Sequence, residues 1–277
     1  MSTDIEWERW GQCDPYYGVL TDPKFRSSAL TAQSKQEFFD SGRIHVGYVL
    51  DMCRLYIDPA FSPKRVLEFG CGVGRLVIPF AEMAGEVTGV DVSPSMLAEA
   101  ARNCNERGLD NVALVRSDET LSATSGQFDL VHSCIVLQHI DVPRGRNLFA
   151  QLVDRVQPGG IGALQVTFGL DLYASTFGQQ PVVPPPPPAP PPDALARVKT
   201  RVKRLLQLLG IRQPPAAVQL LPPAPPPDPE MQMNFYSISE LLFILQRAGV
   251  QRFHTDFTDH GGALGVFFFF QKPAPRS

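Results

Sequence analysis

The chain has 277 residues, with 25 basic and 28 acidic side chains, 44% hydrophobic residues and 19% charged residues. This length and composition exclude general disorder and favour one large domain, or one domain plus appendages, and the net charge of -3 excludes an overall attraction to nucleic acid or to an acidic membrane. The acidic start, the absence of an apolar stretch of ~20 residues and five scattered cysteines without a Cys-x-x-Cys pair predict a reduced, cytoplasmic protein with no membrane span, disulfide framework or zinc site.

The first 60 residues are expected to form a helical cover, with helices over 33–40 and 43–56. Its aromatic residues either cover a functional site or anchor this segment to the core, and both interpretations stay open. Beyond it, short apolar runs alternate with helical patterns, which predicts a parallel sheet wound with helices. The predicted strands are 65–69, 86–90, 112–116, 128–133 and 161–168, and the predicted helices between them are 75–84, 95–107 and 144–156.

A proline-rich insertion at 181–230 holds 17 of the 27 prolines, and its proline runs favour stiff polyproline-II spacers. Between these runs, residues 193–210 place apolar side chains three and four positions apart and carry several basic side chains. This pattern predicts one basic amphipathic helix. The helix fits a lid over an anionic or lipidic substrate, a peripheral surface for a membrane or an acidic partner, or a solvated linker.

The last part of the chain is expected to form a helix over 238–248 and two strands over 251–257 and 263–271. Their short link makes this pair antiparallel, because parallel strands need a long crossover. The run 266–270 is apolar at every position, so the final strand should lie inside the sheet, covered on both faces. The sequence thus predicts an α/β fold, a Rossmann-like doubly wound sheet that is mostly parallel and ends in an antiparallel hairpin, over 61–180 and 231–277.

A glycine-rich turn follows the first predicted strand, with Gly70, Gly72 and Gly74 ahead of a helix. Glycines let the backbone turn sharply and approach a ligand closely. The spacing differs from the dinucleotide pattern, since Arg75 stands where the third glycine is required, and the Gly-Lys-Ser/Thr of a phosphate loop is absent. Neither a nicotinamide site nor a nucleoside triphosphate site is favoured.

Acidic residues follow the next two predicted strands. Asp91 comes 21 residues after Gly70, where a carboxylate can accept both hydroxyls of a ribose, and Asp118 follows the third strand. Because parallel strands end at the same edge of the sheet, both acids should lie beside the glycine turn. The pattern predicts a nucleoside site at this edge.

In these motifs the sequence resembles the class I S-adenosylmethionine-dependent methyltransferases. The resemblance covers about 43–168 and resumes at 236–271, and its motifs lie at 68–74, 89–96, 117–118, 128–131 and 152–160. It implies S-adenosyl-L-methionine as the cofactor and gives roles to several residues. Glu68 would contact the amino group, Gly70 and Gly72 would admit the methionine part, Asp91 would hold the ribose, Asp118 would meet the adenine amine, Val92 and Met96 would pack on the adenine, and the backbone near Cys134 would line the methionine end.

Two histidines are candidates for a general base. Methyl transfer from a sulfonium is a direct displacement, so the protein mainly aligns the reactants, and an oxygen acceptor also needs its proton removed. His139, just past the fourth strand, stands where this family places residues close to the methyl group, and His260 lies in the hairpin tip. A packing role for either histidine stays open, and His132 is expected inside the fold. No metal is expected.

We expect a methyltransferase that acts on a small molecule, at oxygen in preference to nitrogen. The residues after the fourth strand, Ser133 to Val136, lack the Asn/Asp-Pro-Pro-aromatic motif typical of base amine methylation. One alternative keeps the chemistry but takes protein or RNA as the acceptor, docked on the basic helix. Another is a non-catalytic interaction protein whose proline arms recruit partners. The sequence leaves the acceptor and the oligomeric state undetermined.

Overall fold

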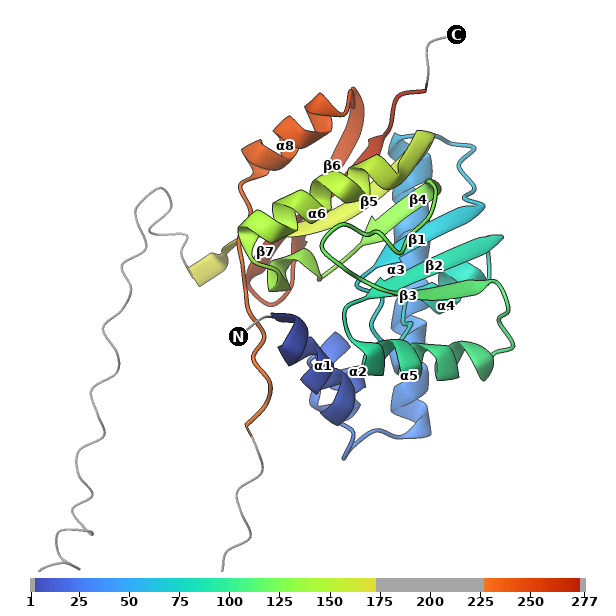
Figure 1. Cartoon of the computed structure of the whole chain (residues 1–277), viewed down its shortest axis with the longest axis vertical. Helices are drawn as coiled ribbons and strands as arrows, with labels where there is room; N and C mark the ends of the chain where they lie inside the picture. The colour runs from blue at the N-terminus through green and yellow to red at the C-terminus, as the bar shows by residue number, and fades with distance from the viewer. Residues whose placement is uncertain (1–2, 173–226, 275–277) are drawn as a thin grey trace, which may run out of the picture. The chain divides into compact units, whose positions relative to one another are not determined.

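The computed structural model describes residues 3–172 and 227–274 (Figure 1). A seven-stranded sheet runs through it in the order β3-β2-β1-β4-β5-β7-β6. Its strands are β1 (Arg65–Phe69), β2 (Glu86–Asp91), β3 (Val112–Arg116), β4 (Phe128–Ser133), β5 (Val156–Leu170), β6 (Arg252–Asp259) and β7 (Ala263–Gln271). The helices are α1 (Thr3–Cys13), α2 (Pro15–Val19), η1 (Pro23–Phe25), α3 (Ala32–Tyr56), α4 (Val77–Ala81), α5 (Pro94–Asn105), η2 (Leu137–His139), α6 (Val142–Arg155) and α8 (Ile238–Arg247).

The sheet is parallel from β3 through β5, and β7 pairs antiparallel with both β5 and β6. This confirms the predicted fold class, including the placement of the last strand inside the sheet. The chain moves from β1 outward to β2 and β3 and then returns to the other side of β1 with β4. Such a reversal leaves a crevice beyond the carboxyl ends of the two central strands, which is where ligands bind in open α/β sheets.

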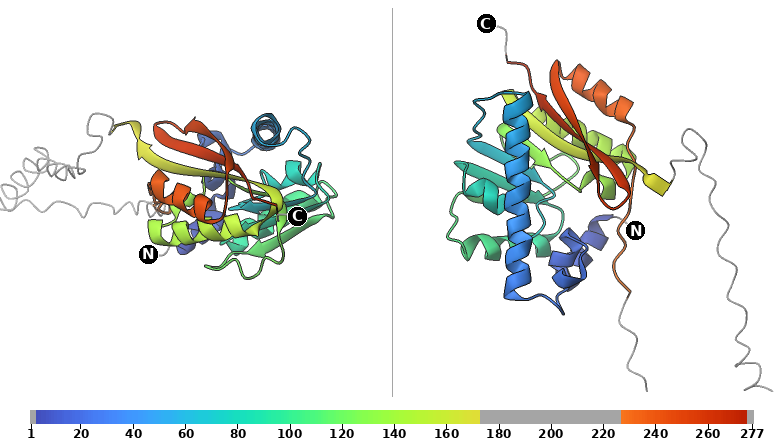
Figure 2. Two further views of the ribbon diagram at one scale, coloured as in Figure 1. Left: turned by 90° about the horizontal axis from the view of Figure 1, so that it is seen from above. Right: turned by 180° about the vertical axis from the view of Figure 1, so that it is seen from behind.

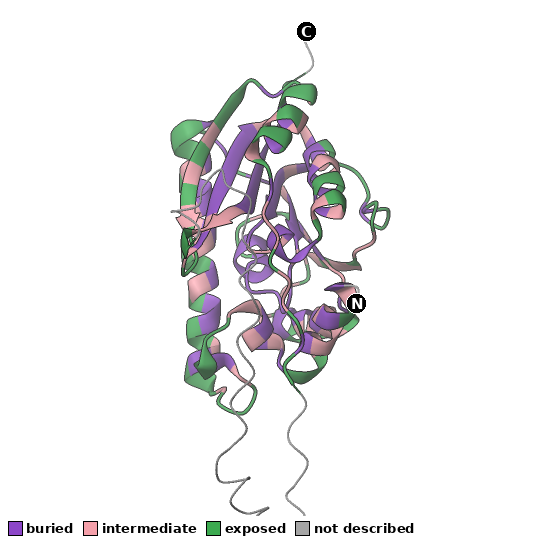
Figure 3. Cartoon of the chain, turned by 90° about the vertical axis from the view of Figure 1, so that its left-hand side faces the viewer, coloured by how far each residue is buried: buried purple, intermediate pink, exposed green. Residues whose placement is uncertain are grey.

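The phenylalanines of β7 explain why this strand lies between two others. Phe267 and Phe269 belong to the core on the side of α3, whereas Phe268 and Phe270 belong to the core on the side of α6 and α8. Side chains alternate between the faces of a strand, so four consecutive phenylalanines need helices on both faces. Figure 2 shows α3 crossing one face of the sheet, and Figure 1 shows α6 and α8 on the other. In Figure 3 the central strands are mostly buried and the helices are exposed on their outer sides.

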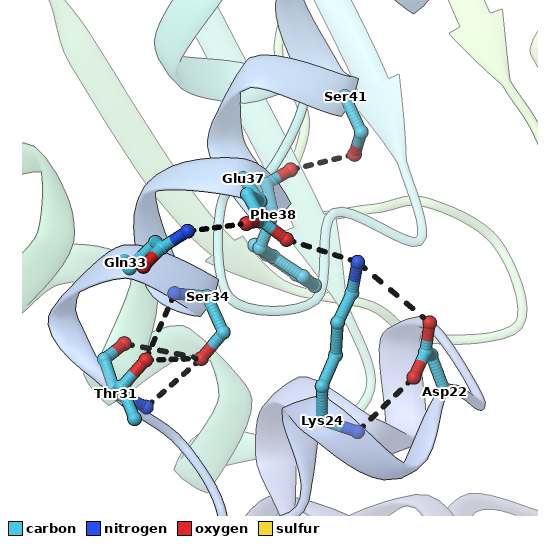
Figure 4. Close-up of polar contacts among 8 residues, drawn as sticks. All are labelled: Asp22, Lys24, Thr31, Gln33, Ser34, Glu37, Phe38 and Ser41. Atoms are coloured by element: carbon cyan, nitrogen blue, oxygen red, sulfur yellow. Dashed lines mark hydrogen bonds and ion pairs between the residues drawn. The ribbon is translucent and has the colours of Figure 1, made fainter.

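Helix α3 is one helix where the sequence predicted two. It begins with a capping box in which Thr31 and Ser34 bond each other's backbone N–H groups, and Glu37 one turn later pairs with Lys24 (Figure 4). The predicted break fell near Gly42, but Gly42 is buried inside the helix. A Cβ at this position would lie 2.2 Å from the carbonyl oxygen of Arg75, so the glycine marks a close contact between backbones.

Other boundaries differ in smaller ways. The predicted helix 75–84 is reduced to α4, because residues 72–76 and 82–83 form turns, and the predicted strand 161–168 extends over the whole of β5. The predicted basic helix at 193–210 and most of the insertion lie outside the described residues. Within 3–172 and 227–274, no helix has both the length and the apolar character needed to cross a membrane.

Candidate functional site

A cavity of about 520 Å³ lies at the carboxyl ends of β1, β2 and β4. This is the crevice at the strand-order reversal, and it joins residues from the sheet, from the N-terminal helices and from the segment before α8. All but one of the predicted site residues line it. They are Glu68, Gly70, Gly72, Asp91, Val92, Met96, Cys134, His139 and His260.

The glycine turn after β1 is held against β2 by hydrogen bonds from the N–H groups of Gly70 and Cys71 to the carbonyl of Val90, at 2.8 and 2.9 Å. Gly70 has φ of 76°, in the left-handed region. A Cβ on Gly70 would lie 2.2 Å from a methyl carbon of Val136. Only glycine therefore allows the loop after β4 to pack against this turn and close one side of the cavity.

Asp91 ties the end of β2 to the glycine turn. Its carboxylate accepts hydrogen bonds from the N–H of Gly72 at 2.8 Å and from the N–H of Ser93 at 2.9 Å. Burial raises the pKa of Asp91 to about 6, and the backbone hydrogen bonds act in the opposite direction. The carboxylate is thus fixed at the cavity wall with acceptor capacity left over, because an ionised carboxylate accepts about four hydrogen bonds.

Asp118 is the predicted site residue that does not line the cavity. Its carboxylate accepts hydrogen bonds from the hydroxyl of Ser122 and from the N–H groups of Ser122 and Thr120, the latter two at 3.0 and 2.8 Å. These bonds, the one from the Ser122 hydroxyl above all, hold the pKa of Asp118 below its usual value. The neighbouring Ser117 lines the cavity instead. The sequence placed this acid at the correct edge of the sheet, but a local turn takes up its carboxylate.

Glu68 and Arg75 are two buried ionisable residues of the cavity wall. The Glu68 carboxyl lies 2.5 Å from Nδ1 of His132, and burial raises the pKa of Glu68 well above its usual value. Arg75 makes one long hydrogen bond, 3.4 Å to the hydroxyl of Ser41, and its Nε has no partner. In the sequence Arg75 stands out only as a departure from the dinucleotide glycine pattern. Its position between a glycine turn and an apolar helix is the signal that could have indicated a cavity residue.

His139 is buried and its tautomer is set by a backbone carbonyl. Nδ1 lies 2.8 Å from the carbonyl oxygen of Gln232, so Nδ1 carries the proton and donates it there. In the neutral ring this leaves Nε2 as a hydrogen-bond acceptor, with the side-chain amide nitrogen of Gln138 at 3.5 Å from it. Burial lowers the pKa of His139, and the ring of Trp7 stands edge-on at 5.0 Å.

His260, in the turn between β6 and β7, also lines the cavity. Its side chain is exposed, and partial loss of solvation lowers its pKa. The structure therefore brings both predicted histidines to the same cavity as the glycine turn. His139 comes from the segment after β4, and His260 comes from the turn between β6 and β7.

The N-terminal helix α1 covers the cavity, with Thr3, Asp4 and Trp7 in its lining. The hydroxyl of Thr3 donates to the carbonyl of His139 at 2.8 Å, and Asp4 forms an ion pair with Arg144 at 2.6 Å. At the other end of the helix, Glu8 accepts hydrogen bonds from residues at the start of α5, namely the Ser93 hydroxyl at 2.7 Å and the N–H and hydroxyl of Ser95 at 3.1 and 2.7 Å. Of the two interpretations left open for the N-terminal aromatics, Trp7 fits the first.

The described residues offer no cluster of three or more histidine, cysteine or acidic side chains that could hold a metal ion. The five cysteines are all free, and four of them are buried.

Comparisons with known proteins address the family. Residues 66–160 match the family model described as a methyltransferase domain, which confirms the resemblance found in the sequence. Aklanonic acid methyltransferase DauC of Streptomyces is 32% identical over 145 residues, covering 49% of this chain and 65% of the relative. A ubiquinone biosynthesis O-methyltransferase of Methylocella silvestris is 34% identical over 107 residues, covering 38% of this chain and 41% of the relative. The ribosomal protein L11 methyltransferase of Burkholderia mallei is 32% identical over 115 residues, covering 41% and 35%. The chain thus matches less than two thirds of the length of these relatives.

Solved structures share the fold over nearly the whole chain. Magnesium protoporphyrin IX methyltransferase of Synechocystis, with bound SAH, has a TM-score of 0.57 at 15% identity and covers 98% of this chain and 100% of its own. The N-methyltransferase NodS of Bradyrhizobium japonicum, in complex with S-adenosyl-l-homocysteine, has a TM-score of 0.55 at 14% identity and covers 99% and 100%. At these identities the likeness establishes the Rossmann-like methyltransferase fold.

Proposed function

We propose that this chain, whose residues 66–160 belong to the methyltransferase domain family, is an S-adenosylmethionine-dependent methyltransferase with a small-molecule acceptor. The observation that carries the proposal is one cavity in which a glycine turn, the carboxylate of Asp91 and the ring of His139 meet. Binding of the cofactor and removal of a proton from the acceptor both require groups of this kind.

The residues of the cavity fit the cofactor part by part. Asp91 would accept the ribose hydroxyls, and Val92 and Met96 would pack on the adenine. Glu68 would pair with the amino group, and the unpartnered Nε of Arg75 suits an anionic group such as the cofactor carboxylate. S-adenosylmethionine, when bound, supplies a methyl group already activated on a sulfonium.

The size and lining of the cavity support a small acceptor. A volume of about 520 Å³ lies within the ~300–1,000 Å³ range of small-molecule sites. Helix α1 covers one side, and the apolar side chains of Trp7, Ile135, Met231 and Met233 line the cavity. A mostly apolar wall favours a small organic molecule over a segment of RNA or protein, which would need a polar groove.

His139 supports an oxygen acceptor. With its Nδ1 proton bonded to Gln232, Nε2 can take the proton of a hydroxyl or carboxylic acid while the oxygen forms a bond to the methyl carbon. The carbonyl of Gln232 then stabilises the imidazolium, and the burial that lowers the pKa of His139 keeps the ring neutral at the start of the step.

Two measurements in sequence test this function. Calorimetry with S-adenosylmethionine should detect binding at one site per chain, and the complex should then be incubated with methyl-labelled cofactor and a panel of phenols, carboxylic acids and amines. We expect label in a hydroxyl or carboxyl compound. Absence of cofactor binding would refute the proposal, and transfer to RNA or protein alone would replace the acceptor class.

A further inference from the structure

Three ionisable side chains form a continuous row of short polar contacts from the cavity to helix α3; we call this row the proton-exchange chain. The carboxyl of Glu68 on β1 lies 2.5 Å from Nδ1 of His132 on β4, and Nε2 of His132 lies 3.1 Å from Nε2 of His45. Glu68 lines the cavity, His132 is fully buried, and His45 is partly exposed on α3. The chain therefore links the cavity floor to the outer layer of the protein.

This geometry allows two arrangements of protons. In the first, Glu68 is a carboxylic acid that donates to Nδ1 of His132, and Nε2–H of His132 donates to His45. In the second, Glu68 is ionised and accepts from Nδ1–H of His132, whose Nε2 accepts from Nε2–H of His45. Both arrangements use the same two short contacts, so the heavy atoms need not move.

The surroundings favour the first arrangement in the free protein. The rings of Phe80 and Phe267 pack on His132 with centroids at 5.6 and 5.8 Å. Burial raises the pKa of Glu68 well above its usual value and lowers the pKa of His132 to about 3. Burial lowers the pKa of His45 as well, so all three groups are driven toward their neutral forms.

Charged and titratable groups face this chain from several elements. Arg75, from the glycine turn, favours ionised Glu68 and opposes charge on either histidine. His260, from the β6–β7 turn, opposes a charged His45, while Asp256 of β6 is bonded to Tyr48, one turn beyond His45. Two thiols and one more carboxyl also lie near. When ionised, the thiols of Cys71 and Cys134 would each repel ionised Glu68, and Cys71 would also repel the carboxylate of Asp91.

We propose that Glu68, His132 and His45 form a proton-exchange chain that lets Glu68 lose its proton when a cationic ligand enters the cavity. This rests on the proposed function, because the ligand is the sulfonium cofactor with its ammonium group. Glu68 passes its proton to Nδ1 of His132, the Nε2 proton of His132 passes to Nε2 of His45, and His45 gives up its Nδ1 proton to water. One proton leaves, and one carboxylate remains to pair with the ammonium. His132 and His45 are positioning residues for Glu68.

Histidine nitrogen spectra of the full chain test the exchange directly. The protein has five histidines, and ¹⁵N–¹H correlation spectra distinguish Nδ1–H from Nε2–H rings. On addition of S-adenosylmethionine we expect His132 to change from the Nε2–H to the Nδ1–H tautomer. His254 stacks on Tyr56 at 3.6 Å and does not belong to the Glu68–His132–His45 proton-exchange chain. It should keep its signals and serves as an internal control. Unchanged His132 signals in a protein saturated with cofactor would overturn the proposal.

Calorimetry in two buffers of different ionisation enthalpy counts the protons released. Wild type should release up to about one proton per cofactor bound near neutral pH. Glu68→Gln should bind about tenfold to a hundredfold more weakly and lose this release, since a hydrogen bond to a charged group is removed. His254→Asn should behave as wild type. Binding with no proton released by the wild type would overturn the exchange while leaving the methyltransferase proposal intact, whereas no binding at all would refute the methyltransferase proposal itself.

Discussion

The two walls of the cavity are built in different ways. One wall comes from turns directly after neighbouring parallel strands, and the sheet register fixes their relative positions. The other wall comes from segments far apart in sequence, joined by side-chain bonds such as Thr3 to His139 and the N–H of Glu230 to Glu6. We call the first wall the cradle, residues 68–75 and 91–96, and the second the cover, residues 3–8, 138–140 and 231–233.

This difference separates two tasks. A site for an invariant cofactor needs fixed geometry, and backbone hydrogen bonds between β1, β2 and the glycine turn provide it. A site for an acceptor needs a shape particular to that molecule, and the cover supplies it without altering the sheet. We therefore expect changes in the cradle to affect cofactor binding and changes in the cover to affect transfer.

The largest effect is expected in the cover, from His139→Ala. Loss of a general base typically lowers kcat by about 10²- to 10⁴-fold for an oxygen acceptor. The affinity for S-adenosylmethionine should stay within about threefold of wild type, because the base acts on the acceptor. Label transfer under saturating cofactor and calorimetry measure the two quantities. A His139→Ala variant with normal kcat and poor cofactor binding would contradict this division and would place His139 in the cofactor site.

Asp91 in the cradle and Asp118 at the next strand end test whether position at this edge of the sheet is enough for cofactor binding. Asp91→Ala should weaken cofactor binding by about a hundredfold or more, because two charge-assisted hydrogen bonds to the ribose would be lost. Asp118→Ala is the matched control, since its carboxylate bonds Thr120 and Ser122 in its own loop. It should change the affinity by less than about threefold. Equal losses in the two variants, measured by calorimetry, would mean that the Asp118 loop opens to reach the adenine.

The cradle could be predicted from the sequence because its signals are local. A buried strand, a glycine turn and Asp91 at the next strand end follow each other within a few dozen residues, and parallel pairing brings them to one edge. Spacing also places Asp118 at the next strand end, but it does not reveal that Thr120 and Ser122 engage the carboxylate.

The cover was much less predictable. His139 could be named as a candidate, but its tautomer depends on the carbonyl of Gln232, a segment 93 residues away. The contact of Trp7 with this ring likewise depends on packing between separate elements. The same holds outside the cover for the Glu68–His132–His45 contacts. No periodicity in the sequence encodes such contacts.

Attachment of the cover can be tested at Glu8, whose carboxylate bonds Ser93 and Ser95 at the start of α5. Glu8→Ala should lower the free energy of unfolding by about 1–3 kcal/mol, because a charged acceptor shared by several donors is lost. Glu37→Ala is the control: it removes only the exposed contacts with Lys24 and Gln33 and should leave the free energy of unfolding nearly unchanged. Urea denaturation measures both. Similar values would show that α1 rests on the cradle without depending on this anchor.

The smallest effect concerns pH, and it has opposite signs for binding and for stability. Asp91 has a pKa raised to about 6 from 3.8. In the Glu68→Gln background, cofactor affinity should fall by about tenfold from pH 7 to pH 5, since the protonated acid no longer offers a charged acceptor to the ribose.

The stability of the free protein should depend on Asp91 in the opposite sense. Between pH 6 and 3.8 the folded state binds more protons at this residue than the unfolded state, so the contribution of Asp91 to stability increases as pH falls. Calorimetry at several pH values measures the cofactor affinity. In Asp91→Asn, studied at higher protein concentration because its binding is weaker, the affinity should no longer fall between pH 7 and pH 5. A pH dependence retained in that variant would assign the titration to another cradle group.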